Sequence, residues 1–293
     1  MATVVTDARI SEGQHFMTLF DEVLKLIRSD TSDEDISNAV CKIIKRRRES
    51  IPNSCAVENF ESMEDLCAYF YRFSPISAEL ARNKTLAAIG NCEELRTRLK
   101  RSSLKILSVG SGPGSDLVGL CSALHETCSF GNLELILVDS NERWERFFRT
   151  TIQVLREGNF GNASKFFKEK EVSTRFICCD VSRTVDVDYE EAFENVDIIW
   201  IKGLLSFLKS DEARSRVSKT IMSLMKSRAL LMVIDSPDCH QFEKFTVELK
   251  PIFSTKTDGF ILHEEPNIVY GPGICSFIHQ EISVYVKLPF DLE

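Results

Sequence analysis

The sequence predicts an α/β protein with a doubly wound, mostly parallel sheet, preceded by a helical cap. From Leu104 onward, short apolar runs rich in β-branched residues alternate with stretches of helical spacing. Such runs suit strands buried on both faces of a parallel sheet, and their alternation with helices indicates βαβ units. Before that point, apolar residues recur at three- and four-residue steps, which is the periodicity of helices.

Composition and length fit a globular chain with one large domain, or a core with an appended subdomain. Of the 293 residues, 43% are hydrophobic and 27% are charged, so the chain can bury a core. We predict a helical cap over 1–100 and a sheet domain over 101–293. The net charge of −8 disfavours a broad phosphate-binding face, so nucleic acid is not the default partner.

Cysteine usage and the N-terminal segment point to a reduced, cytoplasmic protein. The ten cysteines are scattered, without a C-x-x-C pair or zinc spacing, so we expect no structural metal. The N-terminal segment lacks the apolar core of a secretory signal, and no apolar window is long enough to span a bilayer. The basic run Lys45–Arg48 could serve as a nuclear signal, but its spacing favours a solvated helix end.

Four helices are predicted in the cap. The first covers about 14–29, and the second starts near Ser32 and ends in the basic run. A third begins at Ser62, whose Ser-Met-Glu-Asp sequence is a weak capping box, and stops before Pro75. The fourth covers about 76–89.

The sheet domain is predicted from its apolar runs and the segments between them. Five strands are expected at 104–109, 133–138, 176–179, 196–201 and 230–234. Helices are expected between them at 115–127, 141–157, 188–194 and 211–226. A further helix is expected at 238–250, and a late strand at 282–288.

Glycine or polar residues follow all five of these strands. The loop Gly110-Ser-Gly-Pro-Gly114 follows the first, and Asp139, Asp180, Lys202 and Asp235 follow the others in turn. Because ligands bind outside the carboxyl ends of strands in open parallel sheets, these residues should meet at one site.

The chemistry of these residues suits an adenosine-type ligand. Glycine lets the chain turn tightly and approach a ligand, and the next helix offers unpaired N–H groups. The spacing G-x-G-x-G differs from the G-x-G-x-x-G of dinucleotide sites, which favours a ligand without pyrophosphate. Asp139 can accept both ribose hydroxyls, and Asp180 can accept from the adenine amine. Either carboxylate could instead cap a helix or end a strand in solvent.

Residues 104–288 resemble the class I, Rossmann-like S-adenosylmethionine-dependent methyltransferases. The matching segments are LKILSVGSGPG, LILVDS, FICCDVS, VDIIWIKG and ALLMVIDS. The resemblance implies a seven-stranded sheet with a reversed last strand, S-adenosylmethionine as cofactor, and glycines behind its methionine part. The cofactor residues predicted on this basis are Gly110, Ser111, Gly112, Gly114, Asp139, Ser140, Asp180, Val181 and Lys202.

One position departs from the family pattern. The family often carries an acidic residue two positions before the first glycine, where this sequence has Ser108. This substitution weakens the expected contact to the amino group of the cofactor. Asp116 or Lys202 could rearrange around it.

Methyl transfer from a sulfonium is an in-line displacement, so positioning and exclusion of water matter most. A base is needed only where the acceptor holds a proton of high pKa. The candidates for such a role are Lys202, Asp235 and His240, with His263 and Glu264 near a sixth strand.

The sequence lacks the features that two kinds of methyl transfer require. A magnesium site of the catechol type needs carboxylates at the ends of the fourth and fifth strands. Asp197 begins its strand, which leaves only Asp235, so we predict independence from metal. The [ND]-P-P-[FY] motif is absent after the fourth strand, which lowers the expectation of methylation on DNA or amide nitrogen.

The acceptor is expected to enter beneath the N-terminal helices. Tyr71 or Arg72, in an aromatic run that ends before Pro75, could close over the cofactor or the acceptor. The same aromatics at helical spacing could instead form core. The Gly/Pro-rich segment 266–273 is a second lid candidate, although its composition first indicates a turn.

We therefore expect a methyltransferase that acts on a small molecule or a protein side chain. A catalytically silent cofactor-binding or scaffold protein of the same fold is the alternative. An RNA methyltransferase is less favoured by the acidic charge balance, and an NAD-dependent oxidoreductase by the glycine spacing and Asp180. The sequence leaves the acceptor atom and the oligomeric state open.

Overall fold

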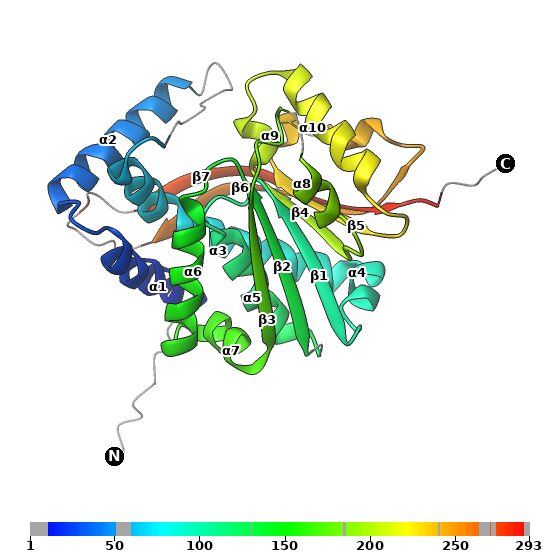
Figure 1. The fold of residues 1–293 in the computed structure, drawn as a ribbon, viewed down its shortest axis with the longest axis horizontal. Coiled ribbons are helices and arrows are strands. Elements are labelled where there is room, and N and C mark those ends of the chain that lie inside the picture. Colours follow the sequence, from blue (N-terminus) through cyan, green and yellow to red (C-terminus); the bar gives the residue numbers. More distant parts are fainter. Residues whose placement is uncertain are drawn as a thin grey trace, which may run out of the picture.

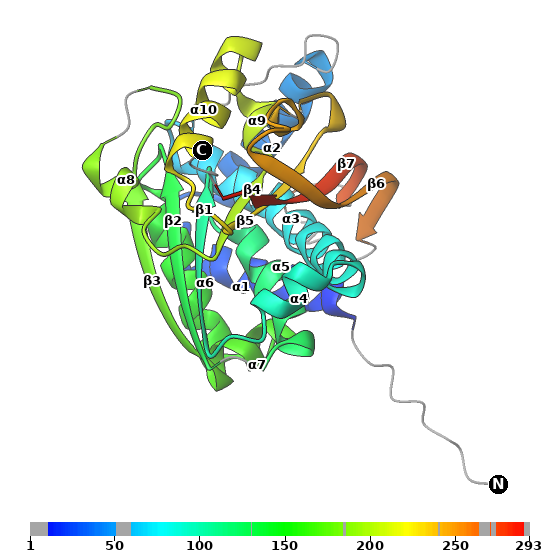
Figure 2. The ribbon, with the colours of Figure 1, turned by 90° about the vertical axis from the view of Figure 1, so that its right-hand side faces the viewer.

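The structure is a computed structural model, which describes a central sheet with helices on both faces (Figure 1, Figure 2). The described residues are 11–50, 60–129, 131–183, 186–239, 241–263, 270 and 274–289. Side chains at 47–50, 259–263 and 274–278 are not described. No helix in these ranges is long and apolar enough to cross a membrane.

Seven strands form one sheet. They are β1 (Ser103–Val109), β2 (Asn132–Asp139), β3 (Glu171–Cys178), β4 (Ile198–Lys202), β5 (Leu230–Asp235), β6 (Leu249–His263) and β7 (Ile274–Lys287). Their order is β3-β2-β1-β4-β5-β7-β6. The strands from β3 to β5 are parallel, whereas β7 is antiparallel to both β5 and β6. The predicted doubly wound sheet with a reversed last strand is therefore confirmed.

Helices cover both faces of this sheet. They are α1 (Glu12–Ile27), α2 (Asp33–Ser50), α3 (Met63–Asn91), α4 (Glu93–Arg98), α5 (Ser115–Thr127), α6 (Trp144–Glu157), α7 (Gly161–Glu169), α8 (Val187–Ala192), α9 (Leu204–Phe207) and α10 (Asp211–Leu224). Side chains of α1, α3, α5, α6 and α7 pack into the core on one face, and those of α8 and α10 into the core on the other. The strand order changes direction at β1, because β2 lies on one side of β1 and β4 lies on the other.

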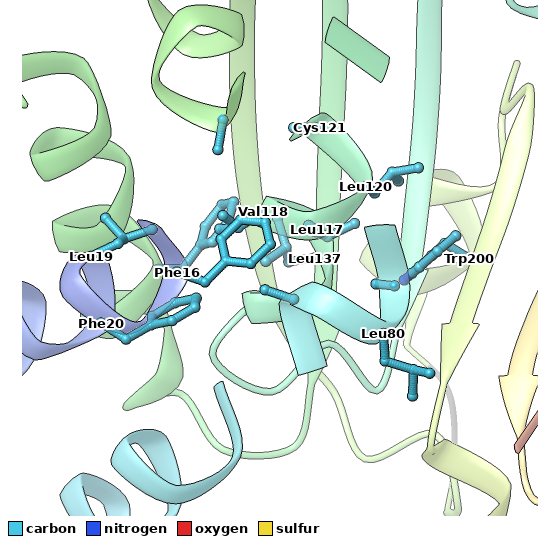
Figure 3. Close-up of a cluster of buried hydrophobic side chains, with 14 of the residues drawn as sticks. Phe16, Leu19, Phe20, Leu80, Leu117, Val118, Leu120, Cys121, Leu137 and Trp200 are labelled. Atoms are coloured by element: carbon cyan, nitrogen blue, oxygen red, sulfur yellow. The ribbon is translucent and has the colours of Figure 1, made fainter. Parts of the chain in front are cut away.

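The alternation of side chains along β1 explains the two cores. Leu104 and Ile106 lie in one hydrophobic cluster, while Leu107 and Val109 lie in the other. Successive side chains of a strand point to opposite faces, so a strand buried on both faces must be apolar throughout. Figure 3 shows part of the first cluster, in which Phe16 of α1 packs with side chains of α5. The N-terminal helices therefore share their core with the sheet.

Pro75 does not end a helix, contrary to expectation. α3 continues through it from Met63 to Asn91, so the helix predicted to begin at Ser62 and the one predicted at about 76–89 are one. Proline removes a single N–H from the helix ladder and crowds the preceding turn. Pro75 is buried in α3, where packing against α5 supports the continuous helix.

The helix predicted at 238–250 is wrong. The chain forms two short 3₁₀ turns, Pro237–Cys239 and Phe242–Lys244, and then enters β6 at Leu249. Phe242 is fully buried, but Val247 is 87% exposed, so no continuous apolar stripe forms here. Phe242 thus packs into the core as a single residue and is not part of an apolar helix face.

Two strands start earlier than predicted. β3, one edge of the sheet, starts at Glu171 rather than 176, and β7, which lies between β5 and β6, starts at Ile274 rather than 282. β6 forms the other edge and pairs with β7, with a register shift between Pro251 and Phe253. Edge strands commonly carry charged residues and proline, so they lack the apolar run that marks a buried strand.

Candidate active site

A cavity of about 1270 Å³ lies at the carboxyl ends of β1 to β4, with α3 on the opposite side. Its lining includes most of the predicted cofactor residues, namely Gly110, Ser111, Gly112, Asp139, Ser140, Asp180, Val181 and Lys202. The glycine loop and the carboxylate at the end of β2 thus face one space. Gly114, the remaining predicted residue, lies behind the loop, where it caps α5.

The three loop glycines need their residue type for different reasons. All three have positive φ, at +71° for Gly110, +51° for Gly112 and +71° for Gly114. A Cβ on Gly110 would lie 2.7 Å from Leu204, and one on Gly114 would lie 2.4 Å from Phe148. A Cβ on Gly112 would meet no atom within 4 Å. Gly110 and Gly114 therefore permit close packing, whereas Gly112 leaves open space in the cavity wall.

Asp139 fixes the glycine loop from the neighbouring strand. Its carboxylate accepts from the backbone N–H of Gly112 at 2.7 Å and from that of Asn141 at 3.0 Å. The backbone N–H of Gly110 also donates to the Val138 carbonyl at 2.9 Å. Burial raises the pKa of Asp139, and the donated N–H bonds oppose this shift. Each carboxylate oxygen offers two lone pairs, so these bonds leave capacity for a ligand.

Asp180 is engaged within its own turn. One oxygen accepts from the N–H of Ser182 at 3.0 Å and from its hydroxyl at 2.6 Å. The other oxygen pairs with Nε of Arg183 at 3.0 Å. This arrangement matches the alternative that the carboxylate stabilises the end of a strand. Asp180 also lines the cavity, so its contact with adenine stays a prediction.

Asp116 reaches the cavity from the first turn of α5. It is only 5% exposed, and its Oδ2 accepts from the indole Nε1 of Trp200 at 2.6 Å. Burial raises the pKa of this carboxyl, and the nearby charge of Lys202 acts in the opposite direction. Asp116 and Lys202 both line the cavity, on the side of β1 that faces β4.

Asp235 has a structural role, which corrects its place among the catalytic candidates. Its side chain is fully buried, and the residue is not among those that line the cavity. Its Oδ2 accepts from the N–H groups of Leu205 at 2.8 Å and Ser206 at 3.3 Å, and its Oδ1 from Ser236 at 2.8 Å. Burial raises the pKa of this carboxyl, and the N–H donors oppose the shift. The carboxylate thus anchors the start of α9.

The other catalytic candidates have different outcomes. Lys202 ends β4 at the cavity. His240 and Glu264 lie outside the described residues, as does the side chain of His263. Asp197 lies at the opposite end of β4, where it pairs with Arg98 at 3.2 Å.

Tyr71 and Arg72 do not line the cavity, contrary to the acceptor-side prediction. Tyr71 is buried, and its ring centroid lies 4.9 Å from that of Tyr270. The guanidinium of Arg72 lies 5.7 Å from the ring of Phe73. Residues four apart share one face of a helix, and on α3 it is Tyr69 and Phe73 that line the cavity.

Four aromatic side chains form what we call the aromatic wall, defined as Phe60, Tyr69, Phe73 and Trp144. The ring centroids lie 4.7 Å apart for Phe60 and Tyr69, 4.9 Å for Tyr69 and Phe73, and 5.4 Å for Phe60 and Trp144. Phe60 and Trp144 were not predicted as site residues. The four-residue spacing of Tyr69 and Phe73 was the signal available for the other two.

Two contacts hold α3 over the glycine loop. The hydroxyl of Ser115, the first residue of α5, donates to the hydroxyl of Ser74 at 2.7 Å in a buried position. A Cβ on Gly119 would lie 1.9 Å from the carbonyl oxygen of Ala78, so only glycine permits this helix crossing. The aromatic wall is therefore positioned by direct contact between α3 and the helix that follows the loop.

The lid candidate at 266–273 lies outside the described residues except for Tyr270. The Tyr270 hydroxyl donates to Asp33 at 2.8 Å and accepts from Arg28 at 3.0 Å. Tyr270 itself therefore lies against the junction of α1 and α2. Burial raises the pKa of Tyr270 to about 12, so the hydroxyl remains protonated at neutral pH.

The sheet order, the reversed β7 and the glycine loop beside an acidic strand end define a class I methyltransferase fold. A family model described as "Putative SAM-dependent methyltransferase" matches residues 27–250, and the chain belongs to this family. Its cofactor is S-adenosylmethionine. The comparison with curated proteins gives no match.

Several solved methyltransferases are similar in structure. A SAM-dependent methyltransferase from Methanosarcina mazei is 13% identical, over 66% of this chain and 97% of that one, with a TM-score of 0.43. A class I methyltransferase from Listeria monocytogenes is 11% identical, over 96% and 90%, with a TM-score of 0.45. The N-methyltransferase NodS from Bradyrhizobium japonicum, in complex with S-adenosyl-L-homocysteine, is 12% identical, over 73% and 99%, with a TM-score of 0.37.

Proposed function

We propose that the cavity binds S-adenosylmethionine across the glycine loop and that the methyl group passes to a small molecule or a protein side chain. The observation that carries this proposal is the bond between the Gly112 N–H and Asp139, in the wall of one cavity. The loop and the carboxylate are thereby held in fixed relation. A ligand that contacts Asp139 must lie against the loop.

The adenosine half belongs on the side of β2 and β3. Asp139 accepts the ribose hydroxyls through the lone pairs that its backbone partners leave open. Ser140 and Val181 follow β2 and β3 and line the same part of the cavity, beside Asp180. The methionine half then crosses Gly112, where no Cβ occupies the space.

The cofactor supplies a methyl group on a sulfonium, which is already activated for displacement. The chain must bind, orient and keep water out. The glycine loop and Asp139 hold one partner, and the aromatic wall with Ile76, Ser77 and Leu80 of α3 faces the other. We infer that residues 1–100 thereby act as the acceptor-side part of the chain.

Lys202 is the candidate that the geometry favours for a polar contact near the transferred group. It follows β4 and lines the cavity beside Phe207 and Leu208. Metal independence also belongs to this proposal, because Asp235 already accepts three backbone N–H groups. Activity lost to a chelator and restored by magnesium would contradict it.

We also propose a cytoplasmic location. The cysteines whose side chains the structure describes, among them the exposed Cys41 and Cys178, are free thiols, as a reducing compartment maintains them. Lys45 and Arg46 are exposed near the end of α2, so this basic run is accessible as a nuclear signal, which is the alternative location. Microscopy of the tagged chain, with and without Lys45→Gln and Arg46→Gln, separates the two locations.

The test of function has two stages. Calorimetric titration of the purified chain with S-adenosylhomocysteine, and separately with NAD, should show binding of the first only. Label from methyl-tritiated S-adenosylmethionine should then appear in the small-molecule or protein fraction of an extract. Label in RNA would contradict the proposed acceptor class. Binding without transfer to any fraction would favour the catalytically silent alternative.

A further inference from the structure

A residue of the reversed strand β7 also reaches the cavity. Within the part of β6 and β7 that the structure describes, Gln280 is the residue that lines it. β7 runs antiparallel to β5, and Glu281 is paired with Asp235, the last residue of β5. The residue before Glu281 therefore lies at the same edge of the sheet as the carboxyl ends of the parallel strands.

The side chain of Gln280 belongs to the face of the sheet that α3 covers. Successive side chains of a strand point to opposite faces. Ile282 and Val284 lie in the core that α3 shares, whereas Tyr285 lies in the other core. Gln280 has the same parity as Ile282 and Val284, and Figure 2 shows α3 beside β7. An amide thus continues a row of apolar side chains where that row meets the cavity.

Lys84 of α3 holds the backbone of Gln280. Its side chain is buried, and Nζ donates to the carbonyl oxygens of Gln280 and of Thr255 on β6, each at 3.0 Å. Burial lowers the pKa of Lys84, and the negative charges of Glu281 and Asp258 oppose this shift. The helix that carries the aromatic wall is therefore tied to the residue by which β7 reaches the cavity.

The amide of Gln280 offers an unused acceptor. Oε1 is buried, and among the described residues it has no hydrogen-bond partner. Buried polar atoms are nearly always paired, so this oxygen calls for a partner. Rotation about the terminal bond exchanges the oxygen and the nitrogen of a glutamine amide, so Oε1 can turn to a ligand. Leu80, four residues before Lys84 on the same face of α3, also lines the cavity.

We propose that Gln280 binds the methyl acceptor by accepting a hydrogen bond from an uncharged N–H or O–H group, and that Lys84 positions it. The inference rests on the proposed function, in which the acceptor faces α3. A carboxylate has no proton to donate to Oε1. An ammonium would be repelled by the charge of Lys84 behind the strand. The acceptor class is therefore one with an amide or hydroxyl group.

The test uses the chain saturated with S-adenosylhomocysteine, so that the proposed cofactor seat is filled. Four probes share one ring and differ in the group that it carries. Benzamide donates N–H, acetophenone only accepts, benzoate is an anion and benzylammonium is a cation. Dissociation constants are measured by ligand-observed NMR titration, and calorimetric titration gives the affinity of each variant for S-adenosylhomocysteine.

Wild type should bind benzamide roughly three- to tenfold more tightly than acetophenone, and both charged probes more weakly than benzamide. Gln280→Met retains the length of the side chain without its amide and should remove this preference. Gln280→Glu retains an accepting oxygen and should widen it, because a charged acceptor binds a donor more strongly. Gln153→Leu, at an exposed glutamine of α6 outside the cavity, is the matched control and should leave it unchanged.

Lys84→Met tests the positioning role. The preference for benzamide should fall to less than about twofold although Gln280 is present, with the affinity for S-adenosylhomocysteine unchanged. The ¹⁵N signal of the Gln280 side-chain amide, assigned by its absence in Gln280→Met, should shift in this variant. A lower melting temperature with the preference retained would show that Lys84 is only structural.

The outcomes separate this inference from the proposed function. If the folded wild-type chain does not bind S-adenosylhomocysteine, the proposed function fails, and this inference fails with it. If that ligand binds, the inference alone is overturned when no probe binds, when benzamide has no advantage, or when Gln280→Met retains the advantage. Should Gln280→Met not fold, as judged by circular dichroism, Gln280→Glu gives an independent reading, and an unchanged ratio of benzamide to acetophenone there overturns the inference.

Discussion

The two walls of the cavity are built in different ways. The sheet wall is built around the glycine loop, whose Gly112 N–H donates to the Asp139 carboxylate at 2.7 Å. The wall on α3 consists of side chains, with the rings of Tyr69 and Phe73 4.9 Å apart. The positive φ angles and close packing of the loop glycines allow few replacements, whereas the α3 face can change one side chain at a time. The sheet wall therefore suits an invariant cofactor, and the helix wall suits a particular acceptor.

The largest expected effect comes from filling the space behind the glycine loop. Gly114→Ala combines a φ of +71° with a Cβ 2.4 Å from Phe148. Left-handed backbone costs an alanine about 1 kcal/mol or more, and the clash adds to this. We expect a clear fall in the melting temperature, measured by differential scanning calorimetry, together with loss of S-adenosylhomocysteine binding.

Gly112→Ala is the matched comparison in the same loop. Its φ is +51°, but a Cβ there would meet no protein atom within 4 Å. We expect a loss of stability of only about 1 kcal/mol, with cofactor binding weakened because the Cβ enters the cavity. Equal melting temperatures for the two variants would show that the packing against Phe148 is not tight.

The second-largest expected effect is the loss of cofactor affinity in Asp139→Ala. Asp139→Ala removes the proposed ribose contact and the acceptor for the Gly112 N–H. A hydrogen bond to a charged group is worth about 1.5–3 kcal/mol, so we expect affinity for S-adenosylhomocysteine to fall about ten- to a hundredfold. Calorimetric titration that showed unchanged affinity would remove Asp139 from the site.

A smaller effect is expected on the helix wall. Phe73→Ala deletes a ring of the aromatic wall, and Tyr71→Phe, on a different face of α3, is the control. An aromatic contact is worth about 0.5–1.5 kcal/mol, so we expect methyl transfer to fall several-fold while S-adenosylhomocysteine affinity stays the same. Affinity lost together with transfer would place the aromatic wall on the cofactor instead.

The smallest effect is a pH dependence of stability. The folded-state pKa of Asp116 is raised by burial, so the folded chain binds more protons there than the unfolded chain. Its contribution to stability is present below the unfolded pKa of about 3.9 and is lost as pH rises through the folded pKa. The melting temperature of wild type should therefore fall relative to Asp116→Asn over this range. A constant difference across pH would contradict the raised pKa.

The sheet wall could be predicted because buried parallel strands leave a plain signal. The apolar run before Gly110 and the run before Asp139 end where β1 and β2 end, so their last residues fall at one edge. β6 lacked that signal because it is an edge strand, with Pro251 at a register shift and Lys256 on its solvent side. Pairing with β7 defines this strand, and pairing partners are not visible in one sequence.

The helix wall was predicted in outline but not in detail. In the aromatic run before Pro75, Tyr71 or Arg72 was predicted to close over the cofactor or the acceptor, whereas α3 places Tyr69 and Phe73 at the cavity. The role of Asp235 was also hidden, because only the fold shows that three backbone N–H groups point at its carboxylate. Which side chains face a cavity depends on packing that a local pattern does not contain.

The most direct test of the central claim is a crystal structure of the chain with S-adenosylhomocysteine. We predict a ribose hydroxyl within hydrogen-bond distance of Asp139, about 2.7 Å, with the chain of the ligand crossing Gly112. A ligand in another part of the molecule, or one in this cavity whose ribose has no contact with Asp139, would contradict the account.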